Sequence, residues 1–138
     1  MSEIIPHSLW IASIGALKDV RRLHELGIRA VVQLAYEELP VALPRDLLAC
    51  RFPLVDGSDN EPALLRLAVA SLTQLLRGKF ATLVCCQAGR SRSPAIAAAA
   101  LAQLTGESFL LCLERVAAKR PCQVHAGLLS QLETLLME

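Results

Sequence analysis

The sequence predicts an α/β fold in which a mostly parallel central sheet is flanked by helices. Three observations support this prediction. Short apolar runs of strand length alternate with segments of helical periodicity, Gly and Pro stand between them, and the last third of the chain shows helical patterns alone. We expect residues 1–138 to form one domain, since a chain of this length can bury a core without disulfide bonds.

Three strands and one helix are predicted in the first half. Residues 9–14 form a short apolar stretch suited to a first strand. Apolar residues then recur at helical spacing over 17–26 and stop at Gly27, a residue typical of helix C-termini. The runs 29–35 and 47–55 are predicted as buried strands with a Pro-marked loop between them.

A helix, a central strand and three further helices are predicted in the second half. Asn60 is expected to cap the first of these helices, and Pro62 suits its first turn. Before a stop at Gly78, the inner face of this helix would consist of Leu65, Ala68, Val69, Leu72 and Leu76. Residues 80–85 form an apolar run suited to a central strand. The remaining helices are predicted over residues 93–104, 108–120 and 126–136.

Composition and charge limit the functional classes. The hydrophobic fraction is 54% with 4% aromatic residues, which predicts an aliphatic core. The formal net charge of +1 gives no support for nucleic-acid or anionic-membrane binding, and no apolar run is long enough to cross a bilayer. The N-terminal MSEIIPHS lacks the layout of a signal peptide, and five unpatterned cysteines indicate reduced thiols in the cytoplasm. No zinc-site spacing and no oligomeric state are indicated.

The segment LVCCQAGRSRSPA, residues 83–95, has the layout of a strand, a loop and a helix start. In open α/β sheets the carboxyl ends of strands carry ligand sites, and a helix N-terminus favours a bound anion. The residues after Cys86 are mostly small, so their amide groups can curl into a nest for an oxyanion. Arg92 adds a planar fork that can bind two phosphate oxygens at once.

Cys86 lies where this nest would hold its anion. A field that attracts phosphate also favours a thiolate, which is a nucleophile suited to covalent catalysis. Ser93, directly after Arg92, can offer its hydroxyl to the sulfur when the thiolate must leave again. Pro94 suits the first helical turn, where a missing N–H is tolerated.

The residues from Cys86 to Ser93 (CQAGRSRS) resemble the C-x5-R-S signature of the cysteine-dependent protein tyrosine phosphatases. The Ala-Gly pair and the Ser-Arg-Ser ending are most similar to the dual-specificity branch. The likeness covers nearly the whole chain. Residues 4–35 resemble that branch's opening strand, helix and strand, FPLVDGSDNEP resembles its general-acid loop, and RPCQVHAGLLSQL resembles its closing helical segment.

The resemblance implies a phosphatase-like phosphate-binding loop and a two-step reaction with no metal or cofactor. Cys86 would attack phosphorus and form a phosphocysteine, while Arg92 would hold the equatorial oxygens and Ser93 would assist the leaving thiolate. Asp56 would protonate the leaving oxygen and then activate water. The substrate-binding amides would come from Gln87, Ala88, Gly89, Arg90 and Ser91.

Three departures from the family pattern leave alternatives open. Cys85 replaces the histidine that precedes the family's nucleophile and helps to order its loop; we expect Cys85 to point to the other side of the strand. Asp59 lies in the same loop as Asp56 and is an alternative general acid, although Asp56 directly follows the FPLV strand as in the family. The Pro-Asn pair of the family has no clear match in QVHAG.

Several functions are compatible with these residues. The first is dephosphorylation of phosphotyrosine in proteins, with phosphoserine and phosphothreonine as further substrates. Small or lipid phosphomonoesters are an alternative, since Arg90 could favour multiply charged substrates. The others are a rhodanese-like sulfurtransferase, which also uses a cysteine in an anion-binding loop, and a phosphate-binding module with little turnover. Glu37 and Glu38 are expected in a polar loop, a region that in this family can border the substrate.

Overall fold

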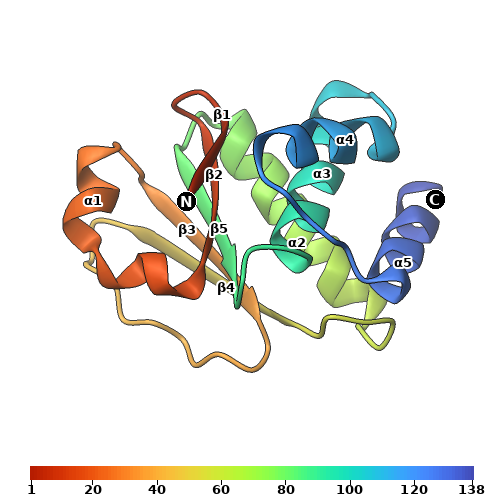
Figure 1. The fold of residues 1–138 in the computed structure, drawn as a ribbon, viewed down its shortest axis with the longest axis horizontal. Coiled ribbons are helices and arrows are strands. Elements are labelled where there is room, and N and C mark those ends of the chain that lie inside the picture. Colours follow the sequence, from red (N-terminus) through yellow and green to blue (C-terminus); the bar gives the residue numbers. More distant parts are fainter.

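A computed structural model describes residues 1–138 as a five-stranded sheet between helical layers (Figure 1). The strands are β1 (Ser2–Ile5), β2 (Leu9–Ser13), β3 (Ala30–Ala35), β4 (Leu48–Leu54) and β5 (Thr82–Cys86). The helices are a 3-10 helix (Ile14–Lys18), α1 (Val20–Glu25), α2 (Pro62–Arg77), α3 (Arg92–Thr105), α4 (Phe109–Lys119) and α5 (Ala126–Leu136).

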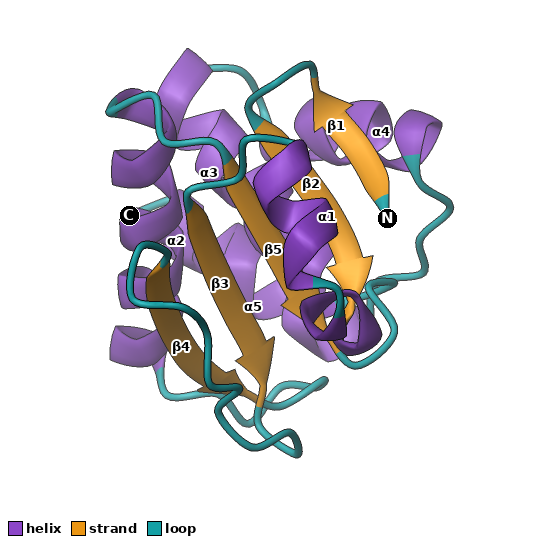
Figure 2. Ribbon diagram, turned by 90° about the vertical axis from the view of Figure 1, so that its left-hand side faces the viewer, coloured by secondary structure: helices purple, strands orange, loops and turns teal.

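The strands lie in the order β1-β2-β5-β3-β4. Four of them are parallel, and β1 pairs antiparallel with β2 at one edge (Figure 2). β5 is central, with the parallel strands β2 and β3 on either side, so the carboxyl ends of all three meet at one edge of the sheet. The predicted α/β fold with a mostly parallel sheet is confirmed.

Two hydrophobic clusters lie on opposite faces of the sheet. The larger contains 26 buried residues between the sheet and helices α2 to α5, and the smaller contains nine residues on the α1 face. Neighbouring residues of a strand point to opposite faces, so Val31 lies in the smaller cluster and Val32 in the larger. In α3, residues 95–100 are fully buried, and five of these six are Ala, which lets the helix pack closely against its neighbours.

Most predicted elements are observed within one or two residues of their expected bounds, with two differences. The helix predicted over 17–26 is divided, because Asp19 leaves helical geometry and its carboxylate accepts a hydrogen bond from the Arg22 amide at 3.1 Å, which caps α1. Strand β1 was not predicted. Its four residues carry little apolar pattern, and its pairing with β2 is a tertiary contact.

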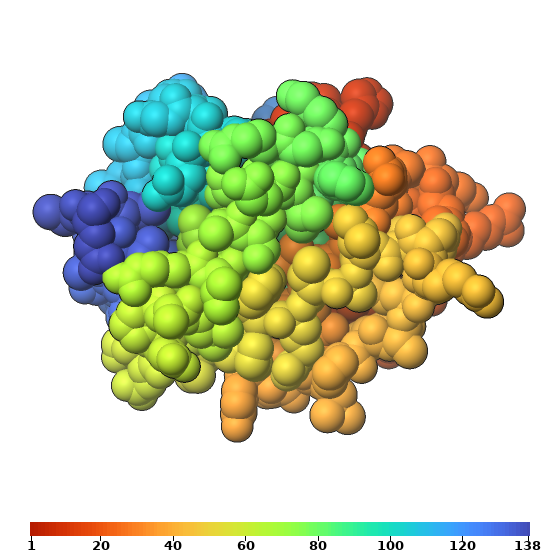
Figure 3. Space-filling model, turned by 180° about the vertical axis from the view of Figure 1, so that it is seen from behind, coloured from red at the N-terminus to blue at the C-terminus, as the bar shows by residue number.

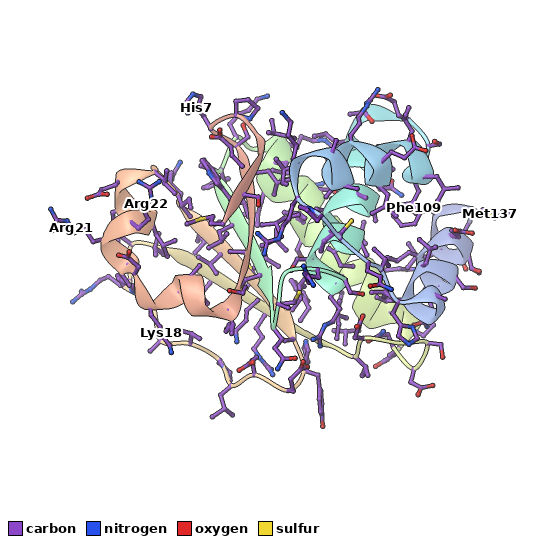
Figure 4. All side chains as sticks on the ribbon, in the orientation of Figure 1. His7, Lys18, Arg21, Arg22, Phe109 and Met137 are labelled. Atoms are coloured by element: carbon purple, nitrogen blue, oxygen red, sulfur yellow. The ribbon has the colours of Figure 1, made fainter.

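The polar residues of α1 and its surroundings lie on the outside of the molecule. Figure 4 shows Lys18, Arg21 and Arg22 around this helix, away from the sheet, and the Arg21 side chain is 90% exposed. From behind, Figure 3 shows the α5 end of the chain (dark blue) at the edge opposite the N-terminal segments (orange). No helix combines the length and the hydropathy that a membrane span requires.

Candidate functional site

Cys86 and Arg92 lie at the two ends of the loop that joins β5 to α3 (Figure 1). Cys86 is the last residue of the central strand and is 2% exposed. Arg92 is the first residue of α3 and is 5% exposed. One end of the loop is thus fixed by the sheet and the other by a buried helix, so the short loop between them is held at the carboxyl edge of the sheet.

This loop borders a cavity of about 240 Å³ that gathers most of the predicted site residues. The lining consists of Asp56, Cys86, Gln87, Ala88, Arg90, Ser91, Arg92 and Gln123. Two guanidinium groups and one carboxylate therefore face the same space as the thiol, which favours an anionic ligand. Gly89 and Ser93 are not part of the lining, although both were predicted as site residues.

The backbone amides of the loop have no hydrogen-bond partner within the protein. Two of its carbonyls bind amides outside the loop: the Gln87 carbonyl accepts a hydrogen bond from the Ile14 amide at 3.3 Å, and the Arg90 carbonyl accepts one from the Gln123 amide at 2.9 Å. None of the N–H groups of residues 87–91 donates to another group of the protein. Five successive donors are therefore available to an oxyanion, as the predicted nest requires.

Gly89 allows this loop to approach the neighbouring strand. Its φ is +68°, in the left-handed region that favours glycine. A Cβ atom at this position would lie 2.7 Å from the Ala12 carbonyl oxygen and 2.8 Å from the Arg120 guanidinium. We call residues 86–92 the cradle. Gly89 lets the cradle pack closely against Ala12 and Arg120 on the side away from the cavity, which is why Gly89 does not line the cavity.

Arg92 is held by a carboxylate from a distant loop. Its Nη1 and Nη2 atoms each donate to Glu37 at 2.6 Å, and Nη1 also donates to the Leu54 carbonyl at 2.9 Å. The hydrogen bonds from Arg92 lower the pKa of Glu37 to about 2, although desolvation opposes them, and the same pairing raises the pKa of Arg92. Three of the five N–H groups are thus used, so the buried Nε–H and the second N–H of Nη2 remain without a partner in the protein and are available to a ligand.

The loop that carries Glu37 is itself fixed by two side chains. Gln33, 5% exposed, donates to the Leu39 carbonyl at 2.7 Å, and Arg51 donates to the Glu38 carbonyl at 3.0 Å. The polar loop expected here is therefore held by hydrogen bonds beside Arg92. Sequence reasoning missed the pairing of Glu37 because its partner lies 55 residues away. The available signal was an acidic residue just after a buried strand that neighbours β5.

Asp56 is attached directly to the cradle. The Ser91 hydroxyl donates to its Oδ1 atom at 2.5 Å and accepts a hydrogen bond from the His125 amide at 2.9 Å. The segment before α5 thus supports the cradle through a backbone amide, in the region where no Pro-Asn pair was found. Asp59, the alternative general acid, is exposed and does not line the cavity. The geometry favours Asp56 over Asp59.

Asn60 does not cap α2 as predicted. Glu61 occupies the N-cap position, while the buried Asn60 side chain accepts from the Val55 amide at 2.7 Å and donates to the Val55 carbonyl at 2.8 Å. Its amide also donates to the Gly57 carbonyl at 3.2 Å. These bonds close the turn that contains Asp56, because a primary amide can donate and accept at once. Asn60 therefore shapes the acid loop.

Cys85 and Ser93 are both fully buried beside the site. Cys85 belongs to the nine-residue cluster and Cys86 to the larger one, so the two thiols face opposite sides of the sheet, as expected. Burial raises the pKa of Cys85 to about 12, which keeps this thiol neutral. The Ser93 hydroxyl has no hydrogen-bond partner within the protein. All five cysteines are free thiols.

Comparisons of the structure identify relatives that sequence comparison does not. No protein-family model matches the sequence, and no curated protein matches it. Human DUSP28 has a TM-score of 0.87 at 25% identity, covering 99% of this chain and 96% of that one. A mouse putative dual specificity phosphatase complexed with zinc tungstate has the same TM-score and identity, over 99% of this chain and 86% of that one. DUSP15 follows with a TM-score of 0.84 at 24% identity, over 99% and 86% of the two chains.

Proposed function

Because the chain has the fold of the dual-specificity branch of the cysteine-dependent protein tyrosine phosphatases, we propose that it is a metal-independent phosphatase acting through a phosphocysteine intermediate. One observation carries the proposal: Cys86, Arg92 and Asp56 face one cavity beside five unpaired backbone amides. We further propose that residues 1–138 act as a single catalytic domain. The five unpaired cysteines are consistent with a reducing compartment such as the cytoplasm.

In the first proposed step, the Cys86 thiolate attacks phosphorus. The S–P bond forms as the bond to the leaving oxygen breaks, and Asp56 in its acid form donates a proton to that oxygen. The loop amides and the free Nε of Arg92 bind the equatorial oxygens, where negative charge is redistributed. The ion pair with Glu37 keeps the guanidinium in place before the substrate arrives.

In the second step, water attacks the phosphocysteine. Asp56, now a carboxylate, accepts a proton from the water, and inorganic phosphate leaves with its bond to Cys86 broken. The buried and unpartnered Ser93 hydroxyl is suited to donate to the departing sulfur. Ser93 lies buried in the first turn of α3, directly after Arg92, and outside the cavity lining.

The proposed substrates are phosphotyrosine esters, and phosphoserine and phosphothreonine esters as well. The cavity wall contains no aromatic side chain that could stack on a phenyl ring of the substrate, and its loop residues include the small Ala88 and Ser91. We therefore expect the site to recognise mainly the phosphoryl group. A protein phosphate and a small phosphomonoester would both fit this description.

Arg90 supports a second candidate substrate class. Its exposed side chain lines the cavity and has no carboxylate partner, unlike Arg92. A free cation at the mouth would favour esters that carry more than one phosphate, such as phosphoinositides. Arg90→Gln should then reduce kcat/KM for a soluble phosphoinositide more than for an aryl monophosphate; equal reductions would remove this candidate.

Detection of the phosphocysteine intermediate tests the proposed function. We expect the purified protein to hydrolyse para-nitrophenyl phosphate in the presence of EDTA, and rapid acid quenching followed by mass spectrometry to find phosphate on the peptide that contains Cys86. Asp56→Asn should slow both steps. With an aryl leaving group that departs without a proton, the second step should be slowed more than the first, so the phosphoenzyme should accumulate in this variant. Phosphate release without any phosphocysteine would contradict the mechanism.

Two other outcomes distinguish the remaining hypotheses. Tight tungstate binding with no phosphate release across a broad pH range would indicate a binding module instead of an enzyme. Sulfur transfer from thiosulfate that survives Asp56→Asn would indicate a sulfurtransferase, because that reaction needs no general acid at this position. Either result would replace the proposed phosphatase.

A further inference from the structure

Arg120 contacts the back of the cradle although nothing in the proposed mechanism uses it. It follows α4 in an extended conformation, with φ at −145°, and its side chain turns toward the loop after β5. Nε donates to the Gly89 carbonyl at 2.7 Å, and Nη2 donates to the Ala88 carbonyl at 3.2 Å. These two carbonyls lie between those of Gln87 and Arg90, which accept hydrogen bonds from backbone amides.

The other end of the guanidinium is fixed to the N-terminal strands. Nη1 donates to the Ser2 hydroxyl at 3.0 Å and to the Ile11 carbonyl at 3.3 Å. Ser2 and Ile11 are partners in the register of β1 and β2, so both acceptors lie at one place on the sheet. Arg120 forms no ion pair with a carboxylate, and all of its hydrogen bonds go to neutral oxygens.

A planar guanidinium holds its donors in fixed directions, so a carbonyl bound to it cannot rotate freely. When the carbonyls of Ala88 and Gly89 are held outward, the amides of the same peptide units point to the opposite side, toward the cavity. The glycine at position 89 also supports this arrangement, because a Cβ atom there would lie 2.8 Å from the Arg120 guanidinium, and only glycine leaves room for it behind the loop.

We propose that Arg120 is a positioning residue that keeps the middle amides of the oxyanion cradle directed at the bound phosphoryl group. The inference rests on the proposed function only in naming the ligand as a phosphoryl group; the orientation of the loop can be measured with any tetrahedral oxyanion. Arg120 touches neither substrate nor Cys86 in this role.

The test measures tungstate affinity by calorimetry together with kcat and KM for para-nitrophenyl phosphate. We expect Arg120→Met to weaken tungstate binding by at least tenfold and to lower kcat by about 100-fold, the scale of loss that a misplacement of about 1 Å causes. Lys119→Met, which removes a neighbouring exposed cation, is the matched control and should stay within about twofold of wild type in both measurements.

Arg120→Lys decides the outcome if Arg120→Met does not fold. A single ammonium can hold one of the two loop carbonyls but not both together with the N-terminal strands, so we expect tungstate affinity to fall by about three- to tenfold. A folded Arg120→Lys or Arg120→Met protein with a lower melting temperature but unchanged tungstate affinity would reduce Arg120 to a structural role and overturn the inference.

The two proposals fail in different ways. A wild-type protein that binds tungstate but releases no phosphate refutes the phosphatase and leaves the Arg120 comparison intact. A wild-type protein that hydrolyses phosphate while Arg120→Met binds tungstate equally well refutes only the role of Arg120. A wild-type protein that binds no tungstate overturns both.

Discussion

Cys85 and Cys86 are adjacent thiols on one strand, yet the sheet places them in different chemical environments. Cys85 packs among apolar residues on the α1 face, where burial raises its pKa to about 12. Cys86 faces the other side and lines a cavity that also holds two arginines. The same contrast recurs at Glu37 and Glu38 and at Asp56 and Asp59. In each pair one carboxylate meets the cradle, and the other does not.

The comparison teaches that chemical identity alone does not select a functional residue. Strand alternation separates the cysteines, because consecutive side chains point to opposite faces. Hydrogen-bonded loops separate the acidic pairs, because a turn brings one carboxylate to Arg92 or Ser91 and leaves its neighbour without such a partner. Three matched pairs of variants can therefore test this difference, since each pair changes the same chemistry at two nearby positions.

The cysteine pair should give the largest effect. Cys86→Ser removes the nucleophile, and we expect hydrolysis of para-nitrophenyl phosphate to fall by at least about a thousandfold. Cys85→Ser should cost less than about tenfold in kcat but destabilise the fold by about 1–3 kcal/mol, because it buries a hydroxyl among apolar side chains. Steady-state kinetics and urea unfolding measure the two effects. An inactive Cys85→Ser protein together with an active Cys86→Ser protein would assign the nucleophile to Cys85 instead.

The aspartate pair comes next. Asp56→Asn should lower kcat by about 10²–10⁴-fold for an alkyl or poorly activated aryl phosphate, because these leaving groups need a proton. The loss should shrink for an ester with a strongly acidic phenol. Asp59→Asn should stay within about twofold for every leaving group, since its side chain is exposed and lies outside the cavity. A larger effect at Asp59 in a leaving-group series would exchange their roles.

The glutamate pair should give the smallest effect. Glu37→Gln removes the ionic partner of Arg92, and we expect KM to rise by about tenfold, whereas Glu38→Gln should leave KM nearly unchanged. Initial rates over a range of substrate concentrations separate KM from kcat. Equal KM values for the two variants would show that the ion pair does not orient Arg92.

Glu37 should also contribute to stability in a pH-dependent way. Its pKa is about 2 in the folded protein against an ordinary value of 4.5, so folding favours the ionised form. The stabilisation is complete above about pH 4.5 and is lost as the pH falls toward 2. The free energy of unfolding of wild type relative to Glu37→Gln should therefore be constant from pH 5 to 7 and decrease below pH 4.5, as urea titrations at each pH would show.

Much of the fold could be predicted from local patterns. The inner face of α2 follows from helical periodicity, and all five of its predicted residues are buried. Asn60 was misassigned because its residue type suits a helix cap, whereas the competing bonds to Val55 and Gly57 depend on the shape of the turn. Strand β1 was missed because its register with β2 supplies what its own sequence does not.

Local sequence patterns were enough to predict the order of strands and helices apart from β1, and the spacing of Cys86 and Arg92 around a loop of mostly small residues, since these depend on neighbours a few residues away. Folding is what pairs Glu37 with Arg92, Ser91 with Asp56 and Arg120 with the back of the loop. These partners come from segments 31 to 55 residues apart. Such contacts exist only when the sheet has brought the segments together, because no local pattern encodes the meeting of two distant side chains.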